Sequence, residues 1–436
     1  MFVTCSSFRP LAVLALSVLA VPLLAQTTYP IEGYISAIHP PRGYEVTGRR
    51  FEVASSTSFG LMSSDSTSVA SPLRESLRVG VYVQVAGTAV NPFSTIKATT
   101  VLIRDDWNQS LSGTCVITRV LSPAPMALFE ADGYLIRIAP STKLAFLGGL
   151  NSLAEVSANA WLHFSGKRDK DGILEAKRAQ FMPAKPTKFR AVKNIEIATV
   201  KTRPADSKDD AMTSEGMGTP AAQSDGAALQ QDEQLKIGLG RWHTLPADQP
   251  LQQRVHRIGM ALVPVYQRDM ADDDPSKIHF RFFAVDNNKL HGADCLLDGA
   301  ILVSTQTIER LTSDDQLAAI VADGVACNLQ RQAARTVVAM RKELGIAIAE
   351  MFFPPAGIVA FASPSLAGGD RAAALQEERL RIALALMRDA GYDPWQAPEA
   401  WRLLDPKKLP ANPASIPYPD TGCYQLGILN LQYARK

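Results

Sequence analysis

The sequence has no strong charge of either sign, few cysteines and no common nucleotide-binding motif. It contains 45 Lys and Arg residues against 43 Asp and Glu residues, so the formal net charge is +2. Proteins built to bind nucleic acids have a basic footprint, and this near-balance argues against that class. Five cysteines in 436 residues exclude a small fold built on disulfides. Neither a P-loop nor a GxGxxG fingerprint occurs.

The composition predicts a globular protein with several domains. Apolar residues make up 46% of the chain, which is enough to build at least one large core. With 28 Gly and 28 Pro, the chain is neither collagen-like nor disordered as a whole. At about 150 residues per domain, the length predicts two or three domains.

Residues 1–25 have the pattern of a secretory signal peptide. Arg9 precedes an uncharged apolar run from Leu11 to Leu24, and Ala25 is suitable for cleavage. The run is shorter than the about 20 residues of an ordinary membrane span. The pattern predicts an exported protein, periplasmic or secreted, cleaved after Ala25. An uncleaved anchor is the alternative. Four cysteines would remain after cleavage, and the sequence does not pair them.

Two similar β-rich segments follow, at 29–105 and 110–183. Short alternating runs are broken by Gly, Pro and Ser, and corresponding glycines recur at an offset of about 80 residues, as in Gly33 and Gly113. Two small all-β barrels of the OB-like type, with about five strands each, fit this spacing. Because no stripe of aromatic and basic residues is evident, a structural or protein-docking role is favoured over ligand binding.

Residues 184–235 are predicted to form a flexible linker. No aromatic residue occurs between Phe189 and Trp242, and residues 201–233 are mostly small or polar, without apolar periodicity. A long functional loop is the alternative interpretation.

The segment 236–436 mixes helix and strand patterns. Ser313, with Gln316 three residues later, is typical of a helix N-terminus. Four further elements are predicted: a helix capped by Asp248 with Pro250 near its start, a strand over Ile278–Phe282, a hairpin at Asp298-Gly299, and a helix over Arg371–Ala390 that stops at Gly391.

The order of these elements resembles the catalytic domain of the zinc metallopeptidases of the CAAX prenyl protease, HtpX and BepA type (peptidase family M forty-eight). The resemblance covers about 237–404. It rests on four matches: Ile258 to Leu262, a hairpin frame formed by Phe283 to Asp286 with Leu297 to Val303, Leu311 to Ala322, and the frame from Glu378 to Pro394, which ends in Ala-Gly-Tyr-Asp-Pro. It implies an α+β, mainly helical domain of the zincin type, placed after the two barrels.

The sequence departs from the family where the HExxH motif should stand. Residues 323–327 read Asp-Gly-Val-Ala-Cys, so Asp323 and Cys327 replace the two zinc-binding histidines. Gly324 occupies the position of the general base and has no side chain to accept a proton. Glu378 keeps the place of the carboxylate ligand, whereas Leu380 replaces the family's nearby Asp.

Three interpretations of this helix follow. In the first, the domain is a pseudopeptidase that has lost zinc and catalysis. In the second, Asp323, Cys327 and Glu378 are degenerate ligand positions that still bind a metal, since carboxylate and thiolate both ligate zinc. In the third, the helix is purely structural: Gly324 is a close-packing point and Cys327 an ordinary buried thiol.

The mostly apolar segment from Leu344 to Ala367 is interrupted by Glu350 and by Pro354-Pro355. These residues argue against a membrane span, and a buried helical hairpin is predicted. The alternative is a lid or a segment at the membrane surface, which would give a peripheral membrane contact through 344–367.

The function expected from the sequence is therefore that of an exported pseudo-metallopeptidase. It is expected to be non-catalytic, to need no cofactor, and to bind a peptide or protein partner in the cell envelope rather than nucleic acid. One alternative is an active zinc metalloendopeptidase with unorthodox ligands. The other is a surface- or glycan-binding protein that acts through its β barrels.

Overall fold

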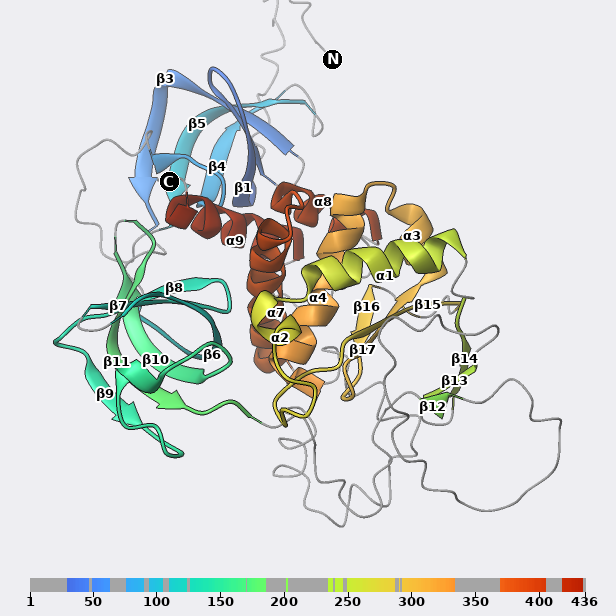
Figure 1. Ribbon diagram of the computed structural model, residues 1–436. Coiled ribbons are helices and arrows are strands. Elements are labelled where there is room, and N and C mark those ends of the chain that lie inside the picture. Colours follow the sequence, from blue (N-terminus) through green and yellow to red (C-terminus); the bar gives the residue numbers. More distant parts are fainter. Residues whose placement is uncertain are drawn as a thin grey trace, which may run out of the picture.

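The computed structural model describes two β barrels and a helical C-terminal region (Figure 1). The residues that it describes are 30–46, 49–62, 76–89, 94–104, 110–123, 126–169, 171–185, 201–202, 234–237, 240–245, 249–286, 290, 292–333, 369–404 and 418–433.

The first barrel closes through five strands in the order β1-β2-β3-β5-β4. β3 and β5 are parallel, and the other neighbours are antiparallel. Alternate residues point inward and form a core of aliphatic side chains around Phe51. The strands are β1 (Ile31–His39), β2 (Gly43–Val46), β3 (Arg49–Leu61), β4 (Tyr82–Thr88) and β5 (Ile96–Ile103).

The second barrel repeats this order as β6-β7-β8-β11-β10, and the pairing of β10 with β11 closes the circuit. A sixth strand, β9, pairs in parallel with β11 outside that circuit. The strands are β6 (Ser110–Ser122), β7 (Ala127–Ala131), β8 (Tyr134–Ile138), β9 (Lys143–Phe146), β10 (Trp161–Arg168) and β11 (Leu174–Met182). The predicted pair of small β barrels is thus confirmed.

Identical internal contacts show that the barrels are true repeats. The hydroxyl of buried Thr57 accepts from the Ala54 N–H (2.8 Å) and donates to the Ala98 carbonyl (2.7 Å). In the second barrel, Thr142 makes the same two bonds, to Ala139 N (3.0 Å) and to the Ala176 carbonyl (2.7 Å).

A glycine breaks the register at the same place in both barrels. Gly87 on β4 and Gly166 on β10 each follow a shift in the pairing with the next strand. A Cβ at either position would collide with a backbone carbonyl of that strand, at Lys97 and Glu175 respectively. Only glycine permits this close approach.

The C-terminal region packs helices on a small sheet with the order β15-β17-β16. β15 (Arg281–Val285) is parallel to β17 (Ala300–Ser304), and β16 (Ala293–Cys295) is an antiparallel edge strand. The helices are α1 (Pro250–Leu262), α2 (Val265–Arg268), α3 (Thr305–Arg310), α4 (Asp314–Leu329), α7 (Gly369–Asp389), α8 (Ala397–Leu404) and α9 (Tyr418–Tyr433). Helix α4 lies at the centre, and all its residues from Leu317 to Leu329 are buried.

Several local predictions in this region are confirmed. The Ser313 hydroxyl accepts from Gln316 N (3.1 Å) at the start of α4. The Gln316 side chain lies toward Gln396 instead of completing the capping box. The last predicted helix corresponds to α7, and Gly391 follows it with a φ of +81°. In α1, Pro250 is the first residue, and Asp248 lies outside the described residues.

Two strand predictions need correction in their bounds. The strand expected over Ile278–Phe282 begins at Arg281, because residues 271–280 form turns and an irregular approach to the sheet. The hairpin has a four-residue loop from Leu296 to Gly299 rather than two residues, and Gly299 takes a φ of +89° within it. Its antiparallel strands, β16 and β17, are present as expected.

Other predictions fall largely on residues outside the described part. The signal peptide (1–25) and the apolar segment 344–367 lie entirely outside it. Within the predicted linker 184–235, the structure describes 184–185, β12 (Lys201–Thr202) and the start of β13 (Gln234–Ile237). These strands form a small sheet with β14 (Gly240–His243). None of the helices described is long and apolar enough to cross a membrane.

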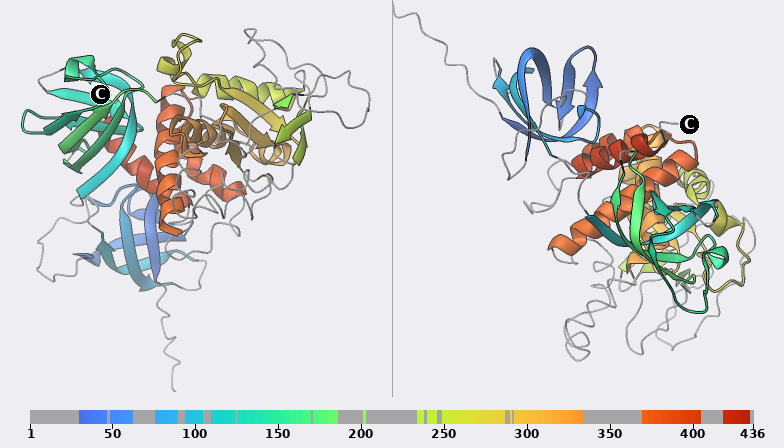
Figure 2. Two further views of the ribbon diagram at one scale, coloured as in Figure 1. Left: turned by 90° about the horizontal axis from the view of Figure 1, so that it is seen from below. Right: turned by 90° about the vertical axis from the view of Figure 1, so that its left-hand side faces the viewer.

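Both barrels dock on the C-terminal helices, and α9 lies beside both of them (Figure 2). Tyr424 of α9 contacts the ring of Tyr34 in the first barrel, with centroids 5.1 Å apart. Its hydroxyl accepts from Arg168 of the second barrel (3.0 Å). Helix α7 packs on the second barrel, where Arg381 Nε donates to the Asp132 carbonyl (2.7 Å).

Candidate functional site

Gly324, at the position of the family's general base, faces the sheet. A Cβ built on Gly324 would lie 2.7 Å from Cγ2 of Ile301 on β17 and 3.4 Å from Cβ of Ala293 on β16. Glycine within a helix costs about 1 kcal/mol relative to alanine. The close packing of α4 on the sheet offsets this cost, and a glutamate would not fit here without moving the helix.

Asp323, at the first histidine position, forms a buried ion pair with Arg379 of α7. The distance from Asp323 Oδ1 to Arg379 Nε is 3.5 Å, and the two side chains are 2% and 6% exposed. A carboxylate and a guanidinium are rarely this buried unless they compensate each other. The Asp323 carboxylate therefore links α4 to α7.

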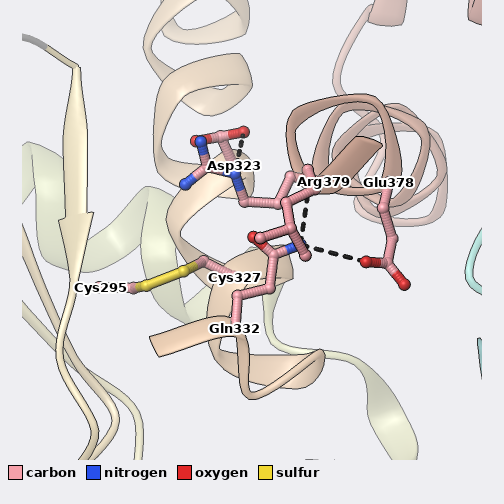
Figure 3. Close-up of a disulfide and its surroundings, with 7 residues drawn as sticks. Cys295, Asp323, Cys327, Gln332, Glu378 and Arg379 are labelled. Atoms are coloured by element: carbon pink, nitrogen blue, oxygen red, sulfur yellow. Dashed lines mark hydrogen bonds and ion pairs between the residues drawn. A yellow bond between two sulfur atoms is a disulfide. The ribbon is translucent and has the colours of Figure 1, made fainter. Parts of the chain in front are cut away.

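Cys327, at the second histidine position, forms a disulfide with Cys295 of β16, with the two Cα atoms 6.1 Å apart. Both residues are buried. The bond ties the central helix to the edge strand of the sheet (Figure 3). A disulfide sulfur is not a thiolate, so Cys327 in this state offers no anionic ligand to a metal.

Glu378, at the position of the carboxylate ligand, lies on α7 and accepts from Gln332 Nε2 (3.4 Å). The same Gln332 amide donates to the Leu375 carbonyl (3.0 Å). Figure 3 shows Glu378 turned toward Gln332, Asp323 toward Arg379, and Cys327 toward Cys295. Leu380, which replaces the family's Asp, is buried.

Burial dominates the electrostatics around Asp323. Removal from water raises its pKa, and the Arg379 charge partly opposes this shift. Asp294, on β16 beside Cys295, is affected in the same way. Burial, with a smaller contribution from the Asp323 charge, raises the Asp294 pKa to about 6, again against the pull of Arg379. Two carboxyl groups thus share one nearby guanidinium.

The residues at these positions do not fit a zinc ion. Zinc is held by three or four convergent deprotonated ligands with a satisfied second shell. Here the sulfur is bonded to another sulfur, Asp323 faces a cation, and Glu378 accepts from an amide. Among the described residues, no group of three His, Cys, Asp or Glu side chains is placed to hold a metal.

Sequence reasoning missed three partners that define this cluster: Cys295, Asp294 and Arg379. Arg379 follows the highlighted Glu378 directly, but it stands in the charged run Gln376 to Arg381, so the sequence does not mark it as a buried partner. No spacing rule pairs cysteines 32 residues apart, so the disulfide could be found only from the fold.

The remaining motif residues have structural roles as well. Gly422, which follows the matched frame in the sequence, lies on α9. A Cβ at Gly422 would be 3.3 Å from Pro398 and 3.7 Å from Leu380. Asp393 of the Gly-Tyr-Asp-Pro turn accepts from Trp395 N (3.0 Å). Its own N–H donates to Asp315 at the start of α4 (2.9 Å).

No protein-family model matches the chain, and no curated protein matches it.

Proposed function

We propose that this chain is an exported pseudo-metallopeptidase, whose zincin-like C-terminal domain binds a peptide or protein partner in the cell envelope without catalysing its hydrolysis. One observation carries the proposal. The positions that the resembling family uses for its metal ligands and base hold a buried ion pair, a helix–sheet contact, a disulfide and an amide contact. Groups that would bind zinc and activate water are thus replaced by contacts that hold α4 against the sheet and against α7.

The edge strand β16 supports a binding role. In the described part of the chain it pairs on one side only, with β17. An extended peptide can add to such an edge through main-chain hydrogen bonds, which require no metal. The bond between Cys295 and Cys327 fixes the edge against α4, and a fixed edge loses less conformational entropy when a strand is added.

The first test is the metal content and peptidase activity of the purified protein. We expect less than about a tenth of an equivalent of zinc, since folding here does not rely on a metal. We also expect no cleavage of casein above the background of a matched blank. One full equivalent of zinc, lost in Glu378→Ala but kept in the neighbouring Glu377→Ala, would overturn the proposal.

The second test locates peptide binding with a defined unfolded probe, reduced and carboxymethylated α-lactalbumin. A photo-crosslinking residue at Leu297, in the loop that directly follows β16, should capture the probe, and one at Glu52 on the first barrel should not. Capture only from positions in 31–182 would favour the barrels as the binding elements instead. Capture from neither region would contradict peptide binding altogether.

A further inference from the structure

The outer face of the second barrel carries four exposed cations on adjacent strands. They are Lys143 on β9, Lys167 on β10, and Lys177 and Arg178 on β11. The side chains belong to the outward set, because their neighbours Phe164, Ala176 and Ala179 point into the barrel core. We call these four residues the basic face.

The strand register brings the four cations close together. Arg178 lies opposite Lys143 on one side and Ser165 on the other. Lys177 is the extra residue at the register shift beside Gly166, and Lys167 pairs with Glu175. Since paired strands lie about 4.8 Å apart, the backbone positions of β9, β11 and β10 fall within about 10 Å across the sheet.

Glu175, the acidic residue opposite Lys167, forms its ion pair with a residue outside the basic face in the part of the chain that the structure describes. None of its four side chains takes part in an ion pair there, and Glu175 is bonded to Arg137 (3.1 Å). The acidic residues Glu130 and Asp132 of this barrel are buried against α7. Like charges opposite each other on a sheet are destabilising, so this arrangement costs the barrel stability.

The first barrel shows that the fold does not require these cations. By ladder register, the equivalents of Lys143, Lys167, Lys177 and Arg178 are Ser58, Thr88, Thr99 and Thr100. There the hydroxyls serve the sheet itself: Ser58 donates to Thr100 Oγ1 (3.0 Å), and Thr99 donates to the Ala86 carbonyl (3.0 Å). Four neutral positions in one repeat have become four cations in the other.

The surroundings of the basic face indicate the chemistry of its partner. No large aromatic side chain is exposed on these strands, so the base-stacking platform of single-stranded nucleic acid binders is absent from this face as described. Hydroxyl and amide groups surround the cations instead. They belong to Ser110, Ser112, Thr114, Ser165 and Gln180.

We propose that the basic face of the second barrel binds an acidic polysaccharide. The four cations pair with its sulfate, phosphate or carboxylate groups, and the neighbouring hydroxyls and amide hydrogen-bond the sugars. All four side chains are exposed while the barrel is docked on α7 and α9, so the barrel can bind the polymer in this arrangement. The proposal is independent of peptide binding at β16.

The test uses heparin and polygalacturonate as probes with the full-length protein, by titration over a range of salt concentrations. A repeat-swap variant, K143S/K167T/K177T/R178T, gives each position the residue of the first barrel. Its affinity should fall about tenfold or more, and the slope of log Kd against log salt should decrease by about 3 to 4. Its circular dichroism should match the parent, because the first barrel already carries these residues in the same strands. Its Tm should not fall, because the substitutions remove the like-charge pair of Lys143 and Arg178.

The matched control removes four exposed cations from other surfaces in R42S/R50S/K97T/R268S. It should bind both polysaccharides as the parent does. An equal loss in this control would overturn the proposal, because it would show attraction to net charge alone. Tighter binding to phosphatidylglycerol vesicles or to a single-stranded oligonucleotide than to both polysaccharides would also overturn it.

Discussion

The two barrels have the same internal construction, but their outer surfaces differ in exposure and in their contacts with the helices. Inside, the strand order, the threonine bonds of Thr57 and Thr142 and the glycine break are the same. Outside, β3 of the first barrel carries exposed polar residues and β2 half-buried ones, whereas the corresponding β7 and β8 are almost entirely buried. The difference arises because α7 covers the second barrel at the β7–β8 turn.

The attachments to the helical region differ in chemistry as well. The first barrel meets α9 through Gly80, where a Cβ would lie 2.5 Å from Cα of Gly427, and through the rings of Tyr34 and Tyr424. The second barrel uses charge, since Arg388 of α7 reaches the buried Glu130 (2.6 Å). Both repeats thus meet the helices at a glycine, since a Cβ at Gly133 would lie 2.7 Å from the Arg381 carbonyl, but only the second adds the buried ion pair of Glu130 and Arg388.

The largest expected effect comes from Arg388→Ala. It leaves the Glu130 carboxylate, 3% exposed, without its close partner, and removing one member of a buried pair costs about 3–5 kcal/mol. Chemical unfolding should show this loss, with hydrogen exchange rising in β7 and β8 but not in β1. The control is Arg119→Ala, which removes an exposed partner 3.9 Å from Glu130 and should cost less than about 1 kcal/mol. Equal losses in both variants would contradict an electrostatic attachment.

The second prediction concerns the pH dependence of stability, which Asp294 gives to the helical region and to neither barrel. Because burial raises the Asp294 pKa from 3.8 to about 6, the folded chain holds this proton more tightly than the unfolded chain. The group therefore reduces stability as pH rises from about 4 to about 6, by at most about 3 kcal/mol. Asp294→Asn should remove that pH dependence. The wild-type minus variant difference in unfolding free energy, measured from pH 4 to 7, would be flat if the shift were absent.

A smaller effect is expected at the contact with the first barrel. Gly427→Leu places a side chain against Val79 and Gly80, and overpacking of this kind costs about 1–3 kcal/mol. Small-angle scattering and limited proteolysis should show the first barrel released while the second stays docked. Asn430→Leu adds the same side chain at an exposed position of α9 and should change neither measurement. Release in both variants would refute the shape-based contact.

The smallest effect tests the equivalence of the two interiors. Thr57→Val and Thr142→Val each remove two hydrogen bonds and leave backbone groups unpaired, at a cost of about 1–2 kcal/mol. Hydrogen exchange within each barrel should report equal losses, and serine at either site should restore most of the stability. A clear inequality would mean that the repeats have diverged inside as well as outside.

Sequence reasoning located the barrels because their construction is local. Glycine spacing and two-residue alternation determine short antiparallel strands, and the repeat doubles the pattern, as Gly87 and Gly166 show. The Ser313 cap and the end of α7 at Gly391 were predictable for the same reason. Each depends on residues within one helical turn.

The candidate site was only half predictable, because its partners are distant in sequence. Asp323 and Cys327 could be singled out, but their contacts come from Arg379 on another helix and Cys295 on a strand. The role of Gly324 depends on Ile301, which the sheet brings beneath it. Docking was equally hidden, since nothing local links Glu130 to Arg388 across more than 250 residues.

Helix α9 has a consequence for the order of events during synthesis. Tyr424 touches both barrels, yet α9 follows the last strand of the second barrel by more than 200 residues. At typical rates of chain elongation, roughly 10–50 s separate these two segments. During that interval neither barrel can contact α9, so the surfaces around Gly80 and Tyr34 are exposed to solvent. The docking of both barrels through Tyr424 is therefore completed only after α9 has been synthesised.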